Sequence, residues 1–129
     1  MGDLTAHFSE SEFACKDTFN TPAPYIPEFL LLVLEDLREH FNAVVTITSG
    51  YRNEFYNAMV GGALNSSHLY NDPDELIAAS DVKVDGIKPS EVFKYLDGKY
   101  GDKISLGKYL LFTHIDTRSK YTGDRSRRW

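Results

Sequence analysis

Two histidines and one aspartate have the surroundings expected of metal ligands. His68 follows two serines in a polar segment, Asp81 stands in a short run of small and β-branched residues, and His114 lies in a later strand-like segment. Two imidazoles and one carboxylate are the usual protein share of a catalytic zinc site, which leaves a fourth position for water. Zinc held in this way would lower the pKa of that water toward neutrality and make it a hydrolytic nucleophile.

The strand patterns around Asp81 and His114 support this interpretation. A carboxylate in an apolar strand, as expected for residues 78–84, is costly to bury unless it is paired or bound to a cation. Residues 108–118 predict a strand with one face that begins apolar and ends polar, comprising Leu110, Phe112, His114, Asp116 and Arg118. Such a change is expected where a strand emerges from the core into a cleft. Spacing alone leaves open that Asp81 pairs with a lysine or caps a loop.

The other histidines and the cysteine favour structural roles. His7 lies in the N-terminal segment, and His40 lies late in a predicted helix, where a positive charge is favourable. Cys15 is the sole cysteine, so no intramolecular disulfide can form. We expect Cys15 to be a small buried side chain, because nothing near it marks the base or the electropositive surroundings of a cysteine hydrolase.

Apolar periodicity predicts the elements that position these side chains. An amphipathic helix follows Pro27, with apolar residues at three- and four-residue steps: Ile26, Phe29, Leu30, Val33, Leu34, Leu37 and Phe41. A short helix is expected over residues 53–59. Pro89 opens a third helix, for which Gly98 is a plausible C-terminal stop. Residues 44–49, 78–84, 104–106 and 108–118 predict strands, with Gly107 at or near the turn between the last two.

These elements predict one α+β domain over residues 1–129, with a small, mainly antiparallel sheet and helices packed on one side. The content of 42% hydrophobic and 26% charged residues is typical of a globular protein. A net charge of -5 disfavours nucleic-acid binding. The longest apolar run, residues 29–34, is too short to span a bilayer, and the first eleven residues lack the apolar segment of a signal peptide. We therefore expect a soluble monomer that binds neither nucleic acid nor membrane.

Several short segments match, in order, those of one enzyme family. They are His7-Phe8-Ser9 with residues 12–16, Ser49-Gly50-Tyr51-Arg52 with Asn57 and Gly61-Gly62-Ala63, Ser66-Ser67-His68, residues 78–82, and residues 113–118 with Arg128-Trp129. In these segments the chain resembles the zinc D-Ala-D-Ala carboxypeptidase and peptidoglycan endopeptidase family, of the lysostaphin, D-Ala-D-Ala metallopeptidase and hedgehog-type fold. The resemblance runs nearly end to end and implies that fold for this chain.

The resemblance also implies a zinc peptidase that hydrolyses peptide bonds of bacterial peptidoglycan, with one zinc ion bound by His68, Asp81 and His114. One departure concerns the segment between the first two ligands, which is longer here than in the family and has Ile77 where a glycine is usual. A longer loop still allows both side chains to reach one metal, because closure entropy grows slowly with length. Competing acidic candidates lie in this segment, at Asp72, Asp74 and Glu75, and in the turn before Gly86, at Asp85.

The resemblance assigns further roles around the metal. Arg52 would steady the carbonyl oxygen or a substrate carboxylate, or else cap the turn after Gly50. Ser66 would position His68 or the substrate backbone, and Tyr51 would line the substrate groove. Asp116 is the candidate general base, and the alternative is that it orients Arg118. The family usually places its base shortly before the last histidine, where this chain has Leu110, Leu111 and Phe112.

Two functional classes follow from these observations. The first is a zinc peptidase that acts on peptidoglycan at the bacterial cell wall, and the lack of an export signal fits a phage lysin or virion component. The second is a non-catalytic peptidoglycan-binding or virion protein that retains the peptidase fold. Metal content and peptidoglycan cleavage distinguish these classes.

Overall fold

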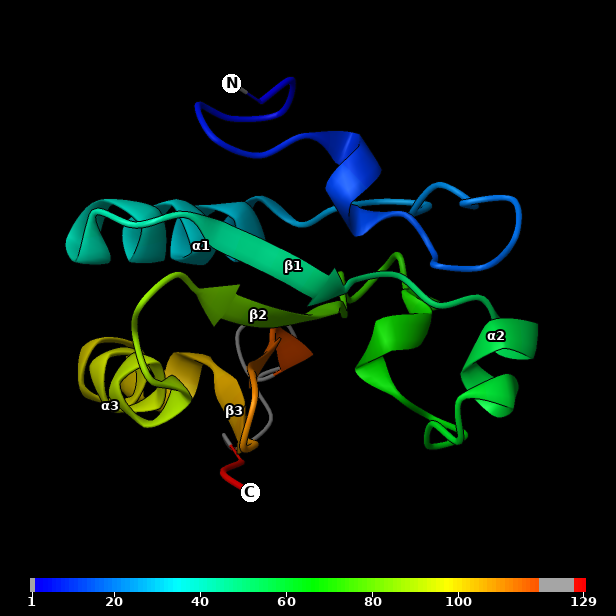
Figure 1. Cartoon of the computed structure of the whole chain (residues 1–129). Helices are drawn as coiled ribbons and strands as arrows, with labels where there is room; N and C mark the ends of the chain where they lie inside the picture. The colour runs from blue at the N-terminus through cyan, green and yellow to red at the C-terminus, as the bar shows by residue number, and fades with distance from the viewer. Residues whose placement is uncertain (1, 119–126) are drawn as a thin grey trace.

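Within residues 2–118 and 127–129, which a computed structural model describes, four strands form one antiparallel sheet in the order β1-β2-β4-β3 (Figure 1). They are β1 (Val45–Ser49), β2 (Ala79–Val84), β3 (Ser105–Lys108) and β4 (Thr113–Asp116). The helices are α1 (Glu28–Phe41), α2 (Glu54–Met59) and α3 (Pro89–Tyr100), with 3-10 turns η1 (Glu10–Phe13), η2 (Ser67–Leu69) and η3 (Gly101–Lys103). The predicted α+β fold is confirmed.

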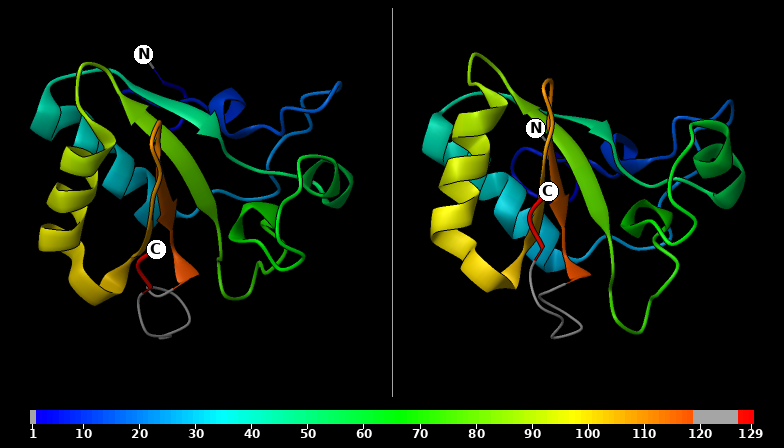
Figure 2. Two further views of the ribbon diagram at one scale, coloured as in Figure 1. Left: turned by 60° about the horizontal axis from the view of Figure 1, so that its bottom comes forward. Right: turned by 90° about the horizontal axis from the view of Figure 1, so that it is seen from below.

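The two faces of the sheet have different roles. Val82 of β2 and Ile115 of β4 belong to the buried core, together with residues of α1 and α3. Figure 2 shows both long helices on the same side of the sheet, away from α2. Because successive side chains of a strand point to opposite faces, Asp81 and His114 project from the face that these helices leave uncovered. The register pairs Asp81 directly with His114.

The predicted amphipathic helix is present as α1, which follows Pro27. Its buried residues are Leu30, Leu31, Val33, Leu34 and Leu37. On its polar side, the Asp36 carboxylate accepts hydrogen bonds from the Tyr95 and Tyr100 hydroxyls and pairs with Lys99 Nζ at 2.8 Å. These contacts join α1 to α3 beneath the sheet.

The predicted end of the third helix was wrong. Gly98 lies inside α3, which continues to Tyr100. The reason is packing: Val92, Leu96 and Tyr100 follow one another at four-residue steps and are all buried. Gly101 ends the helix instead, with a φ of 55° that favours glycine.

The predicted start of the last strand was also wrong. Gly107 lies near the turn, as predicted, but belongs to β3, opposite His114. A Cβ on Gly107 would come within 2.7 Å of the Trp129 ring, so close packing explains this glycine. The turn consists of residues 109–112, which places Leu110 and Phe112 outside β4. Leu110 is 91% exposed, so the apolar part of the predicted strand face does not form.

The side chains assigned to structural roles have such partners. His7 Nδ1 lies 2.7 Å from Glu35 Oε1 and ties the N-terminal segment to α1. His40 stacks on Tyr95, with 3.7 Å between ring centroids. Cys15 is fully buried. None of the helices in the described part of the chain combines the length and apolar character needed to cross a bilayer.

Candidate metal centre

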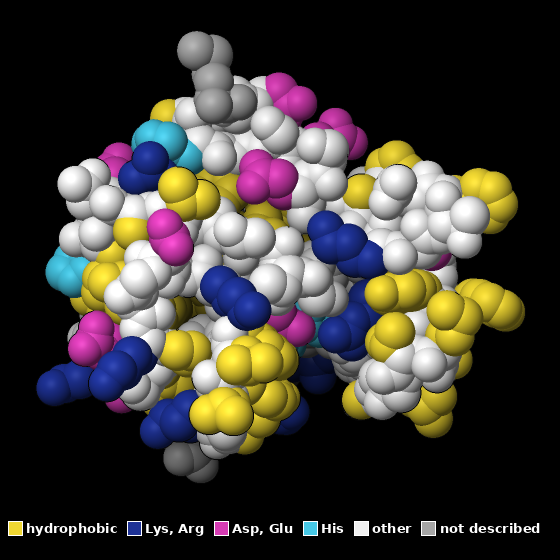
Figure 3. All heavy atoms as spheres, in the orientation of Figure 1, with side chains coloured by type: hydrophobic (Ala, Val, Ile, Leu, Met, Phe, Trp, Pro, Cys, Tyr) yellow, Lys and Arg dark blue, Asp and Glu magenta, His cyan; other side chains and the backbone are white. Residues whose placement is uncertain are grey.

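A cleft of about 540 Å³ opens over the uncovered face of the sheet. Its lining combines residues of β2 and β4 with the segment that contains η2 and with residues 127 and 129. Figure 3 shows charged and histidine side chains in a hollow between two groups of apolar side chains. Val60 lines one apolar wall, and Tyr109, Phe112 and Trp129 line the other.

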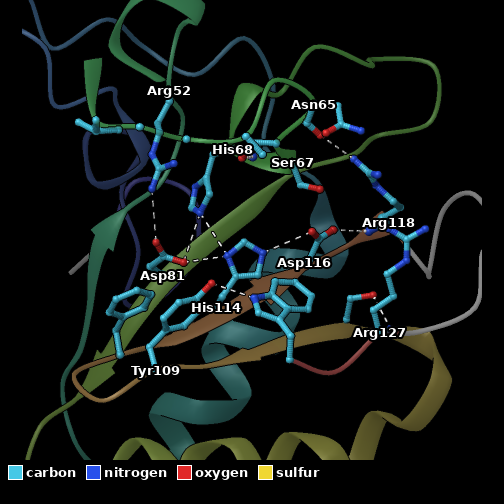
Figure 4. Close-up of a pocket in the computed structure, with 18 residues that line it drawn as sticks. Arg52, Asn65, Ser67, His68, Asp81, Tyr109, His114, Asp116, Arg118 and Arg127 are labelled. Carbon is cyan, nitrogen blue, oxygen red and sulfur yellow. Dashed lines mark hydrogen bonds and ion pairs between the residues drawn. The ribbon is translucent and has the colours of Figure 1, made fainter. Parts of the chain in front are cut away.

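Three potential ligand atoms converge in this cleft. His68 Nε2 lies 3.2 Å from Asp81 Oδ1 and 3.3 Å from His114 Nδ1, and His114 Nδ1 lies 2.9 Å from Asp81 Oδ1. The three residues come from η2, β2 and β4, and all are buried. Figure 4 shows their side chains pointing toward one another. The structure therefore brings together the three ligands that the sequence predicts.

Each imidazole is oriented through its other ring nitrogen. His68 Nδ1 lies 2.7 Å from the Gly50 carbonyl oxygen, which only accepts, so this nitrogen carries a proton. His114 Nε2 lies 3.3 Å from Asp116 Oδ2. When both rings are neutral, these contacts direct the lone pairs of His68 Nε2 and His114 Nδ1 toward Asp81. Metal-binding histidines are commonly held in this manner by a carbonyl or a carboxylate.

The spacing and chemistry of the three ligands fit zinc. Ligand atoms about 2.0–2.1 Å from a tetrahedral zinc ion lie about 3.3 Å from one another. The two separations from His68 Nε2 match that value, and the third, 2.9 Å between His114 Nδ1 and Asp81 Oδ1, is shorter. Two nitrogen ligands also favour zinc over Mg²⁺ and Ca²⁺, which prefer sites made of oxygen atoms. These residues would fill three positions of a tetrahedral site, and the cleft lies beside them.

The electrostatics of the metal-free cluster favour charge on both partners. Burial would raise the pKa of Asp81, but hydrogen bonds and charges of His114 and His68 outweigh it and hold the pKa well below its usual range. Burial would lower the pKa of His114, but hydrogen bonds to Asp116 and Asp81 raise it to about 9. In the absence of metal, the positive charge of protonated His114 therefore partly balances the negative charge of Asp81.

Asp116 lies behind His114. Its Oδ2 contacts His114 Nε2, and its Oδ1 accepts the backbone N–H of Arg118 at 2.9 Å. Burial acts to raise the pKa of Asp116, but hydrogen bonds from His114, Ser67 and the Arg118 backbone leave it below the usual range. Nε2 is on the far side of the imidazole from the Nδ1 ligand atom. This placement suits a residue that orients His114, and its contact with Arg118 is the alternative noted from the sequence.

Arg52 and Ser66 also line the cleft, whereas Tyr51 does not. Arg52 Nη2 lies 3.7 Å from Asp81 Oδ2, and its Nε donates to Ser49 Oγ at 3.2 Å, so the side chain is fixed beside the candidate metal ligands. Ser66 Oγ accepts the backbone N–H of His68 at 3.1 Å and shapes the turn that presents this ligand. Tyr51 packs edge-on against Tyr70 and the core.

Two further residues contribute to the site, although their segments in the sequence indicated no role for either. The Gly50 carbonyl orients His68, and a backbone oxygen leaves no signature in the residue types. Trp129 lies over His114, with 5.0 Å between ring centroids, and its Nε1 donates to the Tyr109 hydroxyl at 2.8 Å. The small size of Gly107, opposite His114, was the available signal for this packing. Among the described residues, the competing acids Asp72, Asp74, Glu75 and Asp85 do not belong to the ligand cluster.

An α+β domain with a buried His, Asp and His group beside an open cleft defines a candidate metallohydrolase. The family described as Peptidase M15 matches residues 6–116, which include the three candidate ligands and Asp116. Because the match covers most of the chain, this protein belongs to the Peptidase M15 family. No curated protein and no solved structure matches the chain. Family and site together indicate a metallopeptidase.

Proposed function

We propose that this chain is a zinc-dependent peptidase that hydrolyses peptide bonds in the D-Ala-containing stem peptides or cross-links of bacterial peptidoglycan. The observation that carries the proposal is the convergence of His68 Nε2, Asp81 Oδ1 and His114 Nδ1 in an open cleft. Membership of the Peptidase M15 family supports the reaction class. The resemblance of the sequence segments to peptidoglycan peptidases supports the substrate.

The residues divide the work of such a reaction. His68, Asp81 and His114 would hold the ion, and Asp116 would keep the His114 ring in its binding orientation. A bound zinc ion supplies a water nucleophile at neutral pH and polarises the scissile carbonyl. Arg52 would steady the carbonyl oxygen, because its Nη2 already lies near Asp81 and guanidinium donors suit a developing negative charge.

Digestion of purified peptidoglycan, with and without a chelator, tests this proposal when mass spectrometry identifies the products. We expect release of peptide fragments that the chelator abolishes and that added zinc restores. The His114→Ala variant should lose both stoichiometric zinc and cleavage. His40→Ala is the matched control, since His40 stacks on Tyr95 on another part of the surface and should leave both unchanged. A native protein that binds no zinc at neutral pH would rule out this function.

One observation favours the second class, a non-catalytic peptidoglycan-binding or virion protein. Both Asp116 oxygens are engaged, and the residues just before His114 are apolar or neutral, so no described carboxylate other than Asp81 faces the metal position. Such a protein would bind zinc and sediment with insoluble peptidoglycan while leaving every wall peptide intact. Co-sedimentation, measured beside the digestion, distinguishes the two classes.

A further inference from the structure

Arginines give the metal cleft a positive lining in a chain whose net charge is -5. The charged side chains among the described lining residues, apart from histidines, are three arginines and two carboxylates: Arg52, Arg118 and Arg127 against Asp81 and Asp116. Both carboxylates already contact histidines. A zinc ion would add two further positive charges, so the cleft is complementary to an anionic ligand.

The arginines occupy opposite ends of the cleft. Arg52 lies at the Asp81 end, whereas Figure 4 places Arg118 and Arg127 together at the Asp116 end. Arg118 donates from Nη2 to the Asn65 carbonyl oxygen at 3.2 Å, which links the residues just after β4 to those just before η2. Its guanidinium is therefore held in the lining of the cleft.

Arg127 reaches the same end by a different route. Its backbone N–H donates to Ser105 Oγ at 3.1 Å, and Ser105 pairs with Asp116 in the β3–β4 register. The neighbouring residue, Arg128, forms a parallel bridge with Leu106 and fixes this segment beside β3. The exposed Arg127 guanidinium makes no hydrogen bond or ion pair with the residues that the structure describes, although it lines the cleft.

We propose that Arg118 and Arg127 form a carboxylate-binding subsite that selects peptides with a free carboxylate near the cleaved bond. The inference rests on the proposed function and specifies its substrate. A planar guanidinium group can bind a carboxylate through two parallel hydrogen bonds. Two such groups at one end of the cleft would attract a carboxylate by their charge and would fix the orientation in which the peptide binds. The carboxylate can be the C-terminus of the peptide or the side group of a glutamyl residue. Both sources offer the same chemistry to the subsite.

Three synthetic stem pentapeptides test the subsite: one with its C-terminal and D-glutamyl carboxylates both free, and two in which one or the other is an amide. Titration calorimetry with the zinc-loaded protein gives Kd, and KM replaces it for any peptide that is cleaved. Amidation of the recognised carboxylate should weaken binding by about 10- to 100-fold. The derivative that weakens identifies the source of the carboxylate.

The Arg118→Gln/Arg127→Gln double variant should bind the acid and amide forms within about threefold of each other. Lys103→Gln removes the same type of charge from η3, outside the cleft, and should retain the full preference. Zinc content and circular dichroism monitor folding. If the double variant fails to fold, Arg127→Gln alone should remove part of the preference, because its side chain bonds to no described residue.

The outcomes separate this inference from the proposed function. Equal binding of acid and amide forms by the native protein, or an undiminished preference in the double variant, overturns the arginine subsite even if peptidoglycan is cleaved. A preference for the acid form without any cleavage supports the subsite and contradicts the peptidase activity. Absence of binding to all three peptides overturns the subsite, and the digestion of peptidoglycan decides the proposed function separately.

Discussion

Replacing Asp116 with asparagine separates a positioning role from a role as general base. Asparagine keeps the size of the side chain and one acceptor oxygen, which can serve His114 Nε2 in place of the Arg118 N–H, but it removes the negative charge. The native carboxylate lies 3.3 Å from Nε2, on the side of the ring away from the Nδ1 ligand atom. From this geometry we expect the substitution to act on zinc binding rather than on proton transfer.

The two roles differ in magnitude as well as in kind. Loss of a carboxylate that orients a metal-binding histidine weakens metal affinity by about 10- to 100-fold, or about 1.4–2.7 kcal/mol. With zinc in excess, kcat should then remain within about threefold of the native value. Loss of a general base would instead lower kcat by about 10²- to 10⁴-fold with zinc affinity preserved.

Competition with a chromophoric chelator at neutral pH measures the zinc affinity, and turnover of a stem peptide in excess zinc measures kcat. Asp74→Asn is the matched control, because it makes the same change on an exposed residue outside the cleft. A large fall in kcat at unchanged zinc affinity would refute the positioning role. Unchanged zinc affinity and unchanged kcat would show that the contact between Asp116 and His114 contributes to neither metal binding nor catalysis.

Three other expectations concern pH and packing. The zinc-free protein should lose up to roughly 3 kcal/mol of unfolding free energy, measured in urea, as the pH rises from 6.5 to about 9. The raised pKa of His114 adds stability that is fully present below pH 6.5 and is lost as the pH rises through the pKa of the folded protein. Zinc loading should remove this pH-dependent loss. Gly107→Ala should cost about 1–3 kcal/mol and shift the emission of Trp129, the single tryptophan, since the added Cβ would lie 2.7 Å from its ring. Asp36→Asn should lower the free energy of unfolding by about 1 kcal/mol at neutral pH. Hydrogen bonds and charge from Lys99, Tyr100 and Tyr95 outweigh burial and lower the pKa of Asp36. The difference in unfolding free energy between variant and native protein should therefore narrow as the pH falls below 3.8.

The sequence predicted those parts of the fold in which periodicity and burial agree. The apolar steps of α1 and the apolar run around Asp81 both correspond to buried elements of the structure. The prediction failed where an apolar residue is exposed: Leu110 extends the alternating pattern but lies in a turn, so the last strand was predicted to begin too early. Periodicity reports residue types, and an exposed leucine has the same type as a buried one.

The candidate site was predictable in its ligands but not in its orientation. His68, Asp81 and His114 could be selected because they stand in segments that resemble those of a zinc peptidase family, whereas spacing alone left other partners open for Asp81. Which nitrogen of each ring faces the cluster depends on the Gly50 carbonyl and on Asp116. The first is a backbone atom and the second depends on strand register, so neither follows from spacing. The proximity of Arg127 to the cleft likewise depends on a parallel bridge of its neighbour with β3.

The insertion between His68 and Asp81 forms a loop that is closed by a backbone bridge and held at its ends by hydrogen bonds. Asp72 and Ile77 form a bridge, the Tyr70 hydroxyl donates to the Ala79 carbonyl at 2.8 Å, and Thr117 Oγ1 accepts the Ala78 N–H at 2.9 Å. The ends of the loop are therefore positioned by β2 and β4, and its length does not set the separation of the two ligands.

The acids of this insertion should consequently be dispensable for metal binding. In the variant Asp72→Asn/Asp74→Asn/Glu75→Gln, the amide at the first position keeps an oxygen for the Glu75 backbone N–H, which Asp72 Oδ1 accepts at 3.1 Å. We expect one zinc ion per chain and an affinity within about threefold of the native value. A tenfold or larger loss would mean that the loop supplies a ligand, in which case the cluster of His68, Asp81 and His114 would be incomplete without it.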